Sequence, residues 1–225
     1  MKKLHPFGGP IKEIGALTDL TAYKYAQFFE LDLEIFQSQN KTKIRPMISR
    51  YRKFDLPDAN SINGILSTGF ANDGFDTYYP QVPQNQTGAP SRKINPLSLW
   101  SNYKSYIIIK LSDSHHWRFS STYYPFTISD KQPVANQLFA NPTLVSVKGG
   151  NIDLYPPKPG DPPKIPMPDS RWAYFLFDGA TASALTGDKY AFTFNIHVEL
   201  LDPVTGTALG LIIDPDVGHP GGSGD

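Results

Sequence analysis

Residues 189–201, with the sequence KYAFTFNIHVELL, alternate strictly between two kinds of side chain. One set is aromatic or aliphatic and consists of Tyr190, Phe192, Phe194, Ile196, Val198 and Leu200. The intervening set is mostly polar and includes Asn195, His197 and Glu199. Because successive side chains of a strand point to opposite faces, the pattern predicts a β-strand with one buried face. We interpret the polar trio as an exposed strand face, with a polar binding stripe as the alternative.

The residues that follow predict a hairpin. DPVTG at 202–206 consists of turn formers, and the apolar run ALGLII at 208–213 predicts the second strand. That run stops at Asp214, Pro215 and Asp216, and the chain then becomes rich in glycine. Proline fixes the backbone and lacks an N–H, so the DPD sequence is typical of a strand stop.

Strand patterns also occur upstream of this hairpin. They lie in FELDLEIF (29–36), SYIIIKLS (105–112), HWRFSSTYYPFTIS (116–129), TLVSV (143–147) and RWAYFLFDG (171–179). With the hairpin they make seven or eight strands, which predicts an all-β protein, a single antiparallel β-sandwich that is jelly-roll-like. A helix capped by Thr18 or Asp19 remains an alternative for the first half of residues 18–36.

Prolines and glycines set the expected organisation of the chain. The 225 residues include 21 prolines and 18 glycines, many of them clustered, which is typical of a β-protein with long connections. We therefore expect one domain over 1–225. It would carry an N-terminal arm at about 1–17, surface loops at 41–60, 80–96 and 156–168, and a glycine-rich tail at 218–225. The 156–168 segment holds seven prolines and predicts a stiff connector.

Charge and cysteine content exclude several partners and chemistries. The chain has 21 basic and 21 acidic residues, so its net charge predicts no nucleic-acid partner. Six basic residues lie in 41–53, and we expect them to neutralise their own domain or a neighbouring subunit. The absence of cysteine excludes disulfides and thiolate chemistry. With no signal-peptide pattern in MKKLHPFGGPIKEIGAL and no long apolar run, we expect a cytoplasmic protein without a membrane partner.

Two Tyr-Tyr-Pro sequences are the candidate ligand site. DTYYP contains Tyr78 and Tyr79, and STYYP contains Tyr123 and Tyr124. Exposed aromatic rings beside polar groups bind carbohydrates and other small ligands. A strand end that buries one ring and exposes the other would give the same sequence, and this is the interpretation we favour.

The strongest metal-ligand pattern is the set Asp214, Asp216 and His219, but the strand stop explains it better, so we expect no metal or other cofactor. His115 and His116 are adjacent and point to opposite faces of a strand, which disfavours a shared metal. Nucleophile-elbow, phosphate-loop, dinucleotide, zinc-protease and calcium-loop patterns are all absent from the sequence. The protein is therefore not expected to be an enzyme, and a metal-dependent enzyme is the third hypothesis.

The order of the last strands resembles a known family. WAYFLFDG, YAFTFNIHVELL and GLIIDPDVGHPGG, within about residues 171–220, resemble the C-terminal part of bacterial β-sandwich proteins of the AidA/PixA inclusion-body type. The resemblance implies a cytoplasmic, non-enzymatic β-sandwich and transfers no catalytic residue. The chain departs from the group in having only three methionines, and its N-terminal half has no counterpart there.

These observations lead to an ordered set of functional hypotheses. The first is a non-catalytic structural protein of a bacterium that self-associates, as a homo-oligomer or in a larger assembly. The alternative is a binding module for a carbohydrate (a glycan) or another small ligand. We also expect the tail at 218–225 to dock onto a neighbouring subunit, because glycines allow close backbone approach.

Overall fold

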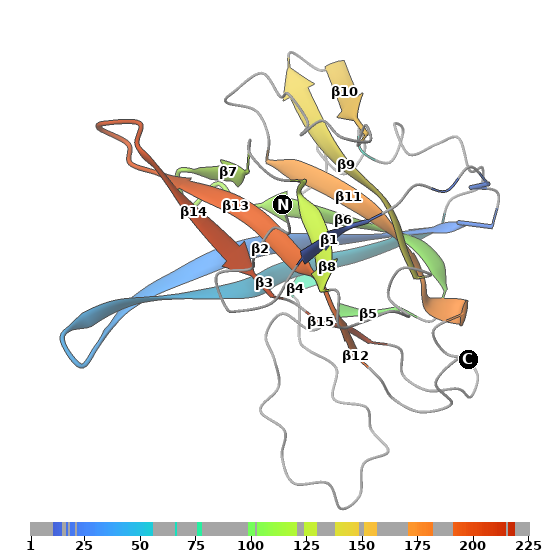
Figure 1. Ribbon diagram of the computed structural model, residues 1–225, viewed down its shortest axis with the longest axis horizontal. Helices are drawn as coiled ribbons and strands as arrows, with labels where there is room; N and C mark the ends of the chain where they lie inside the picture. The colour runs from blue at the N-terminus through green and yellow to red at the C-terminus, as the bar shows by residue number, and fades with distance from the viewer. Residues whose placement is uncertain are drawn as a thin grey trace, which may run out of the picture.

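The chain folds into strands that form three sheets (Figure 1). The computed structural model describes residues 11–14, 17, 19–20, 22–55, 66, 76–77, 99–101, 103–120, 124–129, 138–148, 151–156, 171–181, 191–214 and 216–218. Most of these residues lie in strands, and the few helical ones occur singly or as the short turn at 179–181. The prediction of an all-β chain is therefore confirmed.

The first sheet has five strands and contains the predicted C-terminal hairpin. Its strands are β1 (Ile11–Glu13), β8 (Phe126–Ser129), β13 (Asn195–Leu201) and β14 (Ala208–Ile213) in that order, with β7 (Trp117–Phe119) also pairing with β13. All of its pairs are antiparallel. β13 lies inside the sheet, whereas β14 forms one of its edges.

The second sheet has seven strands and includes the longest hairpin. Its order is β10 (Asn151–Tyr155), β9 (Phe139–Lys148), β11 (Trp172–Asp178), β6 (Lys104–Leu111), β2 (Tyr25–Ser38), β3 (Lys41–Asp55) and β4 (Asp76–Thr77). The third sheet consists of β12 (Ala191–Thr193), β15 (Asp216–Gly218) and β5 (Leu99–Trp100). The pairs β2–β6 and β5–β15 are parallel, so the prediction of wholly antiparallel pairing is wrong.

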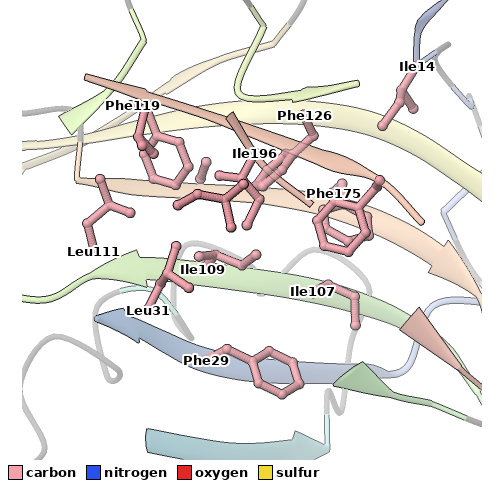
Figure 2. Packing of buried hydrophobic residues seen from close by; sticks show 14 of the residues in the cluster. Ile14, Phe29, Leu31, Ile107, Ile109, Leu111, Phe119, Phe126, Phe175 and Ile196 are labelled. Atoms are coloured by element: carbon pink, nitrogen blue, oxygen red, sulfur yellow. The ribbon is translucent and has the colours of Figure 1, made fainter. Parts of the chain in front are cut away.

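One apolar core joins the five-stranded and seven-stranded sheets. Figure 2 shows Phe119, Phe126 and Ile196 of the first sheet packed above Ile109, Leu111 and Leu31 of the second. Phe126 and Phe175 come from different sheets, and their ring centroids lie 4.9 Å apart. Burial of such aromatic and aliphatic surface is the main favourable contribution to folding.

The seven-stranded sheet also buries its other face. Residues that alternate with those of the first core form a second cluster, which includes Phe28, Tyr106, Ile108, Trp172, Tyr174 and Leu176. Successive residues of β11 are all buried as a result. The same holds for residues 105–109 of β6.

Two predictions in the N-terminal half are wrong. Residues 41–55, predicted as part of a loop over 41–60, form strand β3. Thr42, Ile44 and Pro46 alternate there with Lys41, Lys43 and Arg45, so the basic side chains occupy one face of a strand. Pro46 is tolerated because, in the part of the chain that the structure describes, β3 has a second neighbour only at Arg50 and Tyr51, where it pairs with β4. The helix alternative also fails, since β2 runs from Tyr25 to Ser38.

The other predicted segments are described only in part. Within the arm at 1–17, residues Ile11–Glu13 form β1 and pair with β8. The loop at 80–96 lies outside the described residues, as do 157–168 of the proline segment. Of the tail at 218–225 only Gly218 is described, and it pairs with Ala191.

Candidate functional site

Few of the sequence-predicted site residues have a described position. Tyr78, Tyr79 and Tyr123 lie outside the described residues. Tyr124 is described and is only 5% exposed, so its ring is not offered to a ligand at the surface. The sequence pattern could not distinguish a buried ring of the Tyr-Tyr-Pro pair from an exposed one.

The predicted metal ligands at the end of β14 are separated by a change of sheet. Asp214 is exposed and follows β14, whereas Asp216 opens β15 in the three-stranded sheet. The DPD sequence thus ends one strand and begins another, rather than ending the sheet structure. His219 is outside the described residues, and those that are described contain no group of three side chains able to hold a metal.

The polar face of β13 is buried, contrary to the prediction that it is exposed. His197 is 1% exposed, and Asn195 and Glu199 are each 7% exposed. Strands β7 and β8 bring polar partners beside them: Glu199 pairs with Arg118 and Asn195 pairs with Thr127. The pattern did show which residues share the face, but it did not show what lies beside them.

Each polar group of this face has a short contact. Arg118 donates from Nε to Glu199 at 2.8 Å, and a second contact from Nη2 is also 2.8 Å. Ser120 donates to the other carboxylate oxygen at 3.2 Å. Asn195 donates to the Thr127 hydroxyl at 3.1 Å, and that hydroxyl lies 2.8 Å from Nε2 of His197.

The chemistry of this set is structural. A buried carboxylate is tolerated when a guanidinium neutralises its charge and a hydroxyl donates a hydrogen bond to it, as Arg118 and Ser120 do for Glu199. A general base would need a free lone pair facing a substrate, whereas both Glu199 oxygens are already acceptors. The polar face therefore fixes β13 against β7 and β8.

The turn of the β13–β14 hairpin is fixed by Asp202. Its Oδ1 accepts hydrogen bonds from the backbone N–H of Thr205 and of Val204, each at 2.8 Å. These bonds, the Thr205 one first, favour the charged carboxylate and lower the pKa of Asp202. Gly206 has a φ of 70°, which glycine adopts without strain, and its N–H donates to the Asp202 carbonyl at 2.9 Å.

β14 presents one unpaired edge. In the described part of the chain, β13 is the only strand that pairs with it. The Asp202 N–H donates to the Thr207 carbonyl at 2.9 Å, and residues along an antiparallel ladder alternate between inward and outward backbone groups. By the same alternation, the backbone groups of Leu209 and Leu211 bond toward β13. The backbone N–H and C=O groups of Ala208, Gly210 and Ile212 point away from it.

The side chains of β14 are apolar and largely exposed. Leu209 is 57% exposed, while Leu211 is partly buried against the core and Ile213 is buried. The strand carries no charge, no proline and no bulge, which are the devices that usually protect a sheet edge. Figure 1 shows the hairpin projecting beyond the rest of the five-stranded sheet. This edge is the candidate functional site.

A second projecting hairpin is protected instead. β2 pairs with β6 only as far as Leu31, so the outer part of β2–β3 extends as a two-stranded arm (Figure 1). The arm carries Lys41, Lys43 and Arg45. Arg45 pairs with Glu34 on the neighbouring strand. Repeated like charges along an edge oppose the addition of an identical strand. β14 carries no charge and so does not oppose it.

His115 and His116 lie in the bend immediately before β7, which begins at Trp117. His115 Nε2 lies 2.8 Å from the Leu33 carbonyl, and Ser112 donates to Asp32 at 2.7 Å. Nearby, partial burial acts to raise the pKa of Asp113, but the cations of Lys110 and Arg171 outweigh it and lower that pKa. These contacts attach the segment after β6 to the start of the arm.

Comparison with known proteins adds no assignment: no protein-family model and no curated protein sequence matches the chain. No helix among the residues with a described structure has the length and hydropathy needed to cross a bilayer.

Proposed function

We propose that this protein is a non-catalytic structural protein of the bacterial cytoplasm that self-associates through the edge of β14. Its two larger sheets would form one β-sandwich of jelly-roll-related type. The resemblance of residues 171–220 to the AidA/PixA inclusion-body proteins supports this class of function. Fold type alone does not determine function, so the proposal depends on a surface feature.

That feature is the outer edge of β14, with which no strand among the described residues pairs. Outward backbone groups at Ala208, Gly210 and Ile212 are satisfied by water in the monomer and by a strand in an assembly. The exposed Leu209 adds apolar area that association would bury. The turn at Asp202 and the buried polar face of β13 hold the edge in place, so little conformational entropy is lost on association.

The test changes the edge without changing the hairpin. Gly210→Pro removes one outward N–H, and the β13–β14 ladder keeps its bonds because Gly210 does not bond toward β13. Gly210→Ala is the matched control, since it retains the N–H and an added Cβ meets nothing within 4 Å. Light scattering after size-exclusion chromatography then gives the particle mass of each variant over a range of concentrations.

We expect the wild-type protein and Gly210→Ala to form the same oligomer. For Gly210→Pro the dissociation constant of the oligomer should be at least tenfold higher. Circular dichroism and thermal unfolding verify that each variant is folded. A wild-type protein that stays monomeric at the highest concentration would contradict the proposal.

A further inference from the structure

We propose that the partner of β14 is β14 of a second copy, antiparallel to it, with a two-fold axis that passes beside Gly210. This inference rests on the proposed function, because it identifies the partner and the register of the same edge. The pairing would join two five-stranded sheets into one continuous sheet.

The sequence of the edge is nearly symmetric about Gly210. Leu209 and Leu211 flank it, and Ala208 and Ile212 lie one step further out. An antiparallel pair centred on Gly210 therefore places Leu209 of one copy opposite Leu211 of the other. Opposed side chains of this kind lie about 4.5–5.5 Å apart and stabilise a sheet by direct contact. Both leucines lie on the face that packs toward the core, so the apolar layer continues across the axis.

Backbone geometry is compatible with the same centre. Gly210 is one of the residues whose N–H and C=O point outward, so Gly210 of each copy exchanges both bonds with its symmetry mate. Ala208 and Ile212 form the next bonded pairs on either side. A shift by one residue would oppose outward groups with inward ones and lose these bonds. The position of Gly210 is also open, because a Cβ atom added there would have no other atom within 4 Å.

Charge permits this pairing with an identical strand. Residues 208–213 carry no charge, so no like charges meet across the axis. Asp214 of each copy lies four residues from the centre, which separates the two carboxylates by about 26 Å at the usual rise of a strand. The basic arm of β2–β3 lacks this property, since its lysines would approach their own symmetry mates.

The symmetry also limits the size of the assembly. A two-fold contact uses the same surface on both copies and is closed at two copies, whereas addition of β14 to a different edge would build a larger ring or an open filament. The inference therefore predicts a dimer through this edge.

The absence of cysteine from the chain makes single cysteines a clean probe of the register. The variants are Gly210→Cys, Ala208→Cys and Ile212→Cys, with Ala180→Cys at an exposed position as the control for random collision. Each is oxidised at the concentration where the dimer forms and analysed by non-reducing electrophoresis. The particle mass of each reduced variant is measured first.

In the proposed register the Cα atoms of Gly210 and its mate are about 5.5 Å apart, within the range that a disulfide spans. Identical positions at 208 or at 212 are separated by about 13 Å and are out of range. We expect Gly210→Cys to form a covalent dimer at least tenfold faster than Ala180→Cys. Ala208→Cys and Ile212→Cys should each remain at the control level alone, but cross-link with each other when mixed.

The outcomes separate the two proposals. An oligomer that forms but cross-links no faster at 210 than at 180 would overturn the two-fold register and leave self-association intact. A chain that is monomeric throughout would overturn both. Rapid cross-linking of Ala208→Cys alone, without a mixed product, would also contradict an axis at Gly210.

Discussion

The seven-stranded sheet is buried on two faces that differ in chemistry. Toward the five-stranded sheet it presents hydrocarbon side chains such as Phe29, Ile107 and Phe175. On the other face the same strands present Tyr106, Tyr174 and Trp172, and a group of charged residues lies further along β2 and β6. The first face contributes through packing alone, whereas the stability of the second also depends on protons and salt. Burial of a strand face therefore does not by itself say which forces hold it.

The largest effect is expected at the hydrocarbon face. Phe175 is fully buried and contacts the rings of Phe126, Phe139 and Phe194, with centroids 4.9–5.5 Å away. Phe175→Ala should lower the free energy of unfolding by about 3–5 kcal/mol through lost burial and the cavity left behind. Chemical denaturation measures this loss, and Phe175→Leu should cost clearly less. Equal losses for the two variants would show that the ring does not fill a packed site.

The phenol face should respond to alkaline pH. Burial, then the charge of Asp178 and the neighbouring Tyr106, raise the pKa of Tyr23 to about 12, and burial followed by Tyr174 raises the pKa of Tyr106 to about 12. Both phenols bind their protons more tightly in the folded chain than in the unfolded one, where the pKa is about 10. Their contribution is therefore complete below pH 10 and is lost as pH rises from about 10 through 12.

The loss should be on the order of 2 kcal/mol for each phenol. Denaturant unfolding at pH 7 and at closely spaced values from 9.5 to 11.5 measures it. Tyr106→Phe removes one ionisation and should flatten the decline, with its own stability at pH 7 as the reference. An unchanged decline in Tyr106→Phe would show that this phenol is not responsible.

The local sequence predicts which residues form strands better than it predicts which strands lie side by side. β13, β14, β6 and β11 were all predicted, because alternation and short apolar runs depend on residues adjacent in the chain. β3 was missed because its basic residues were interpreted as a loop, although they alternate with Thr42 and Ile44. The parallel contact of β2 with β6 has no local signal, since it joins residues about 80 positions apart.

The same limit applies to the polar face of β13. The alternation identified Asn195, His197 and Glu199 as one face, but their partners come from β7 and β8. Arg118 is 81 residues from Glu199, so the sequence gives no means of choosing it over another arginine. The same limit applies to the edge of β14, which has no second neighbour among the described strands, because only the assembled sheet reveals which strands lie side by side.

The smallest effect is expected where the second face reaches solvent, and two glutamates on β2 provide a matched pair. Glu30 has a side chain only 13% exposed, accepts from Lys110 at 3.2 Å and lies 3.5 Å from Arg50. Glu34 pairs with Arg45 on the outer arm, where the side chains are 43% and 58% exposed. Glu30→Gln should therefore cost about 1 kcal/mol, and Glu34→Gln should cost less than about 0.5 kcal/mol after solvent screening.

Denaturant unfolding at low and high salt measures both. Added salt should remove the Glu34 effect and leave most of the Glu30 effect, because partly buried charges are screened less. Equal costs, or equal salt dependence, would mean that the charged group on β2 and β6 is as solvated as the arm, and the second face would then be held by its aromatic residues alone.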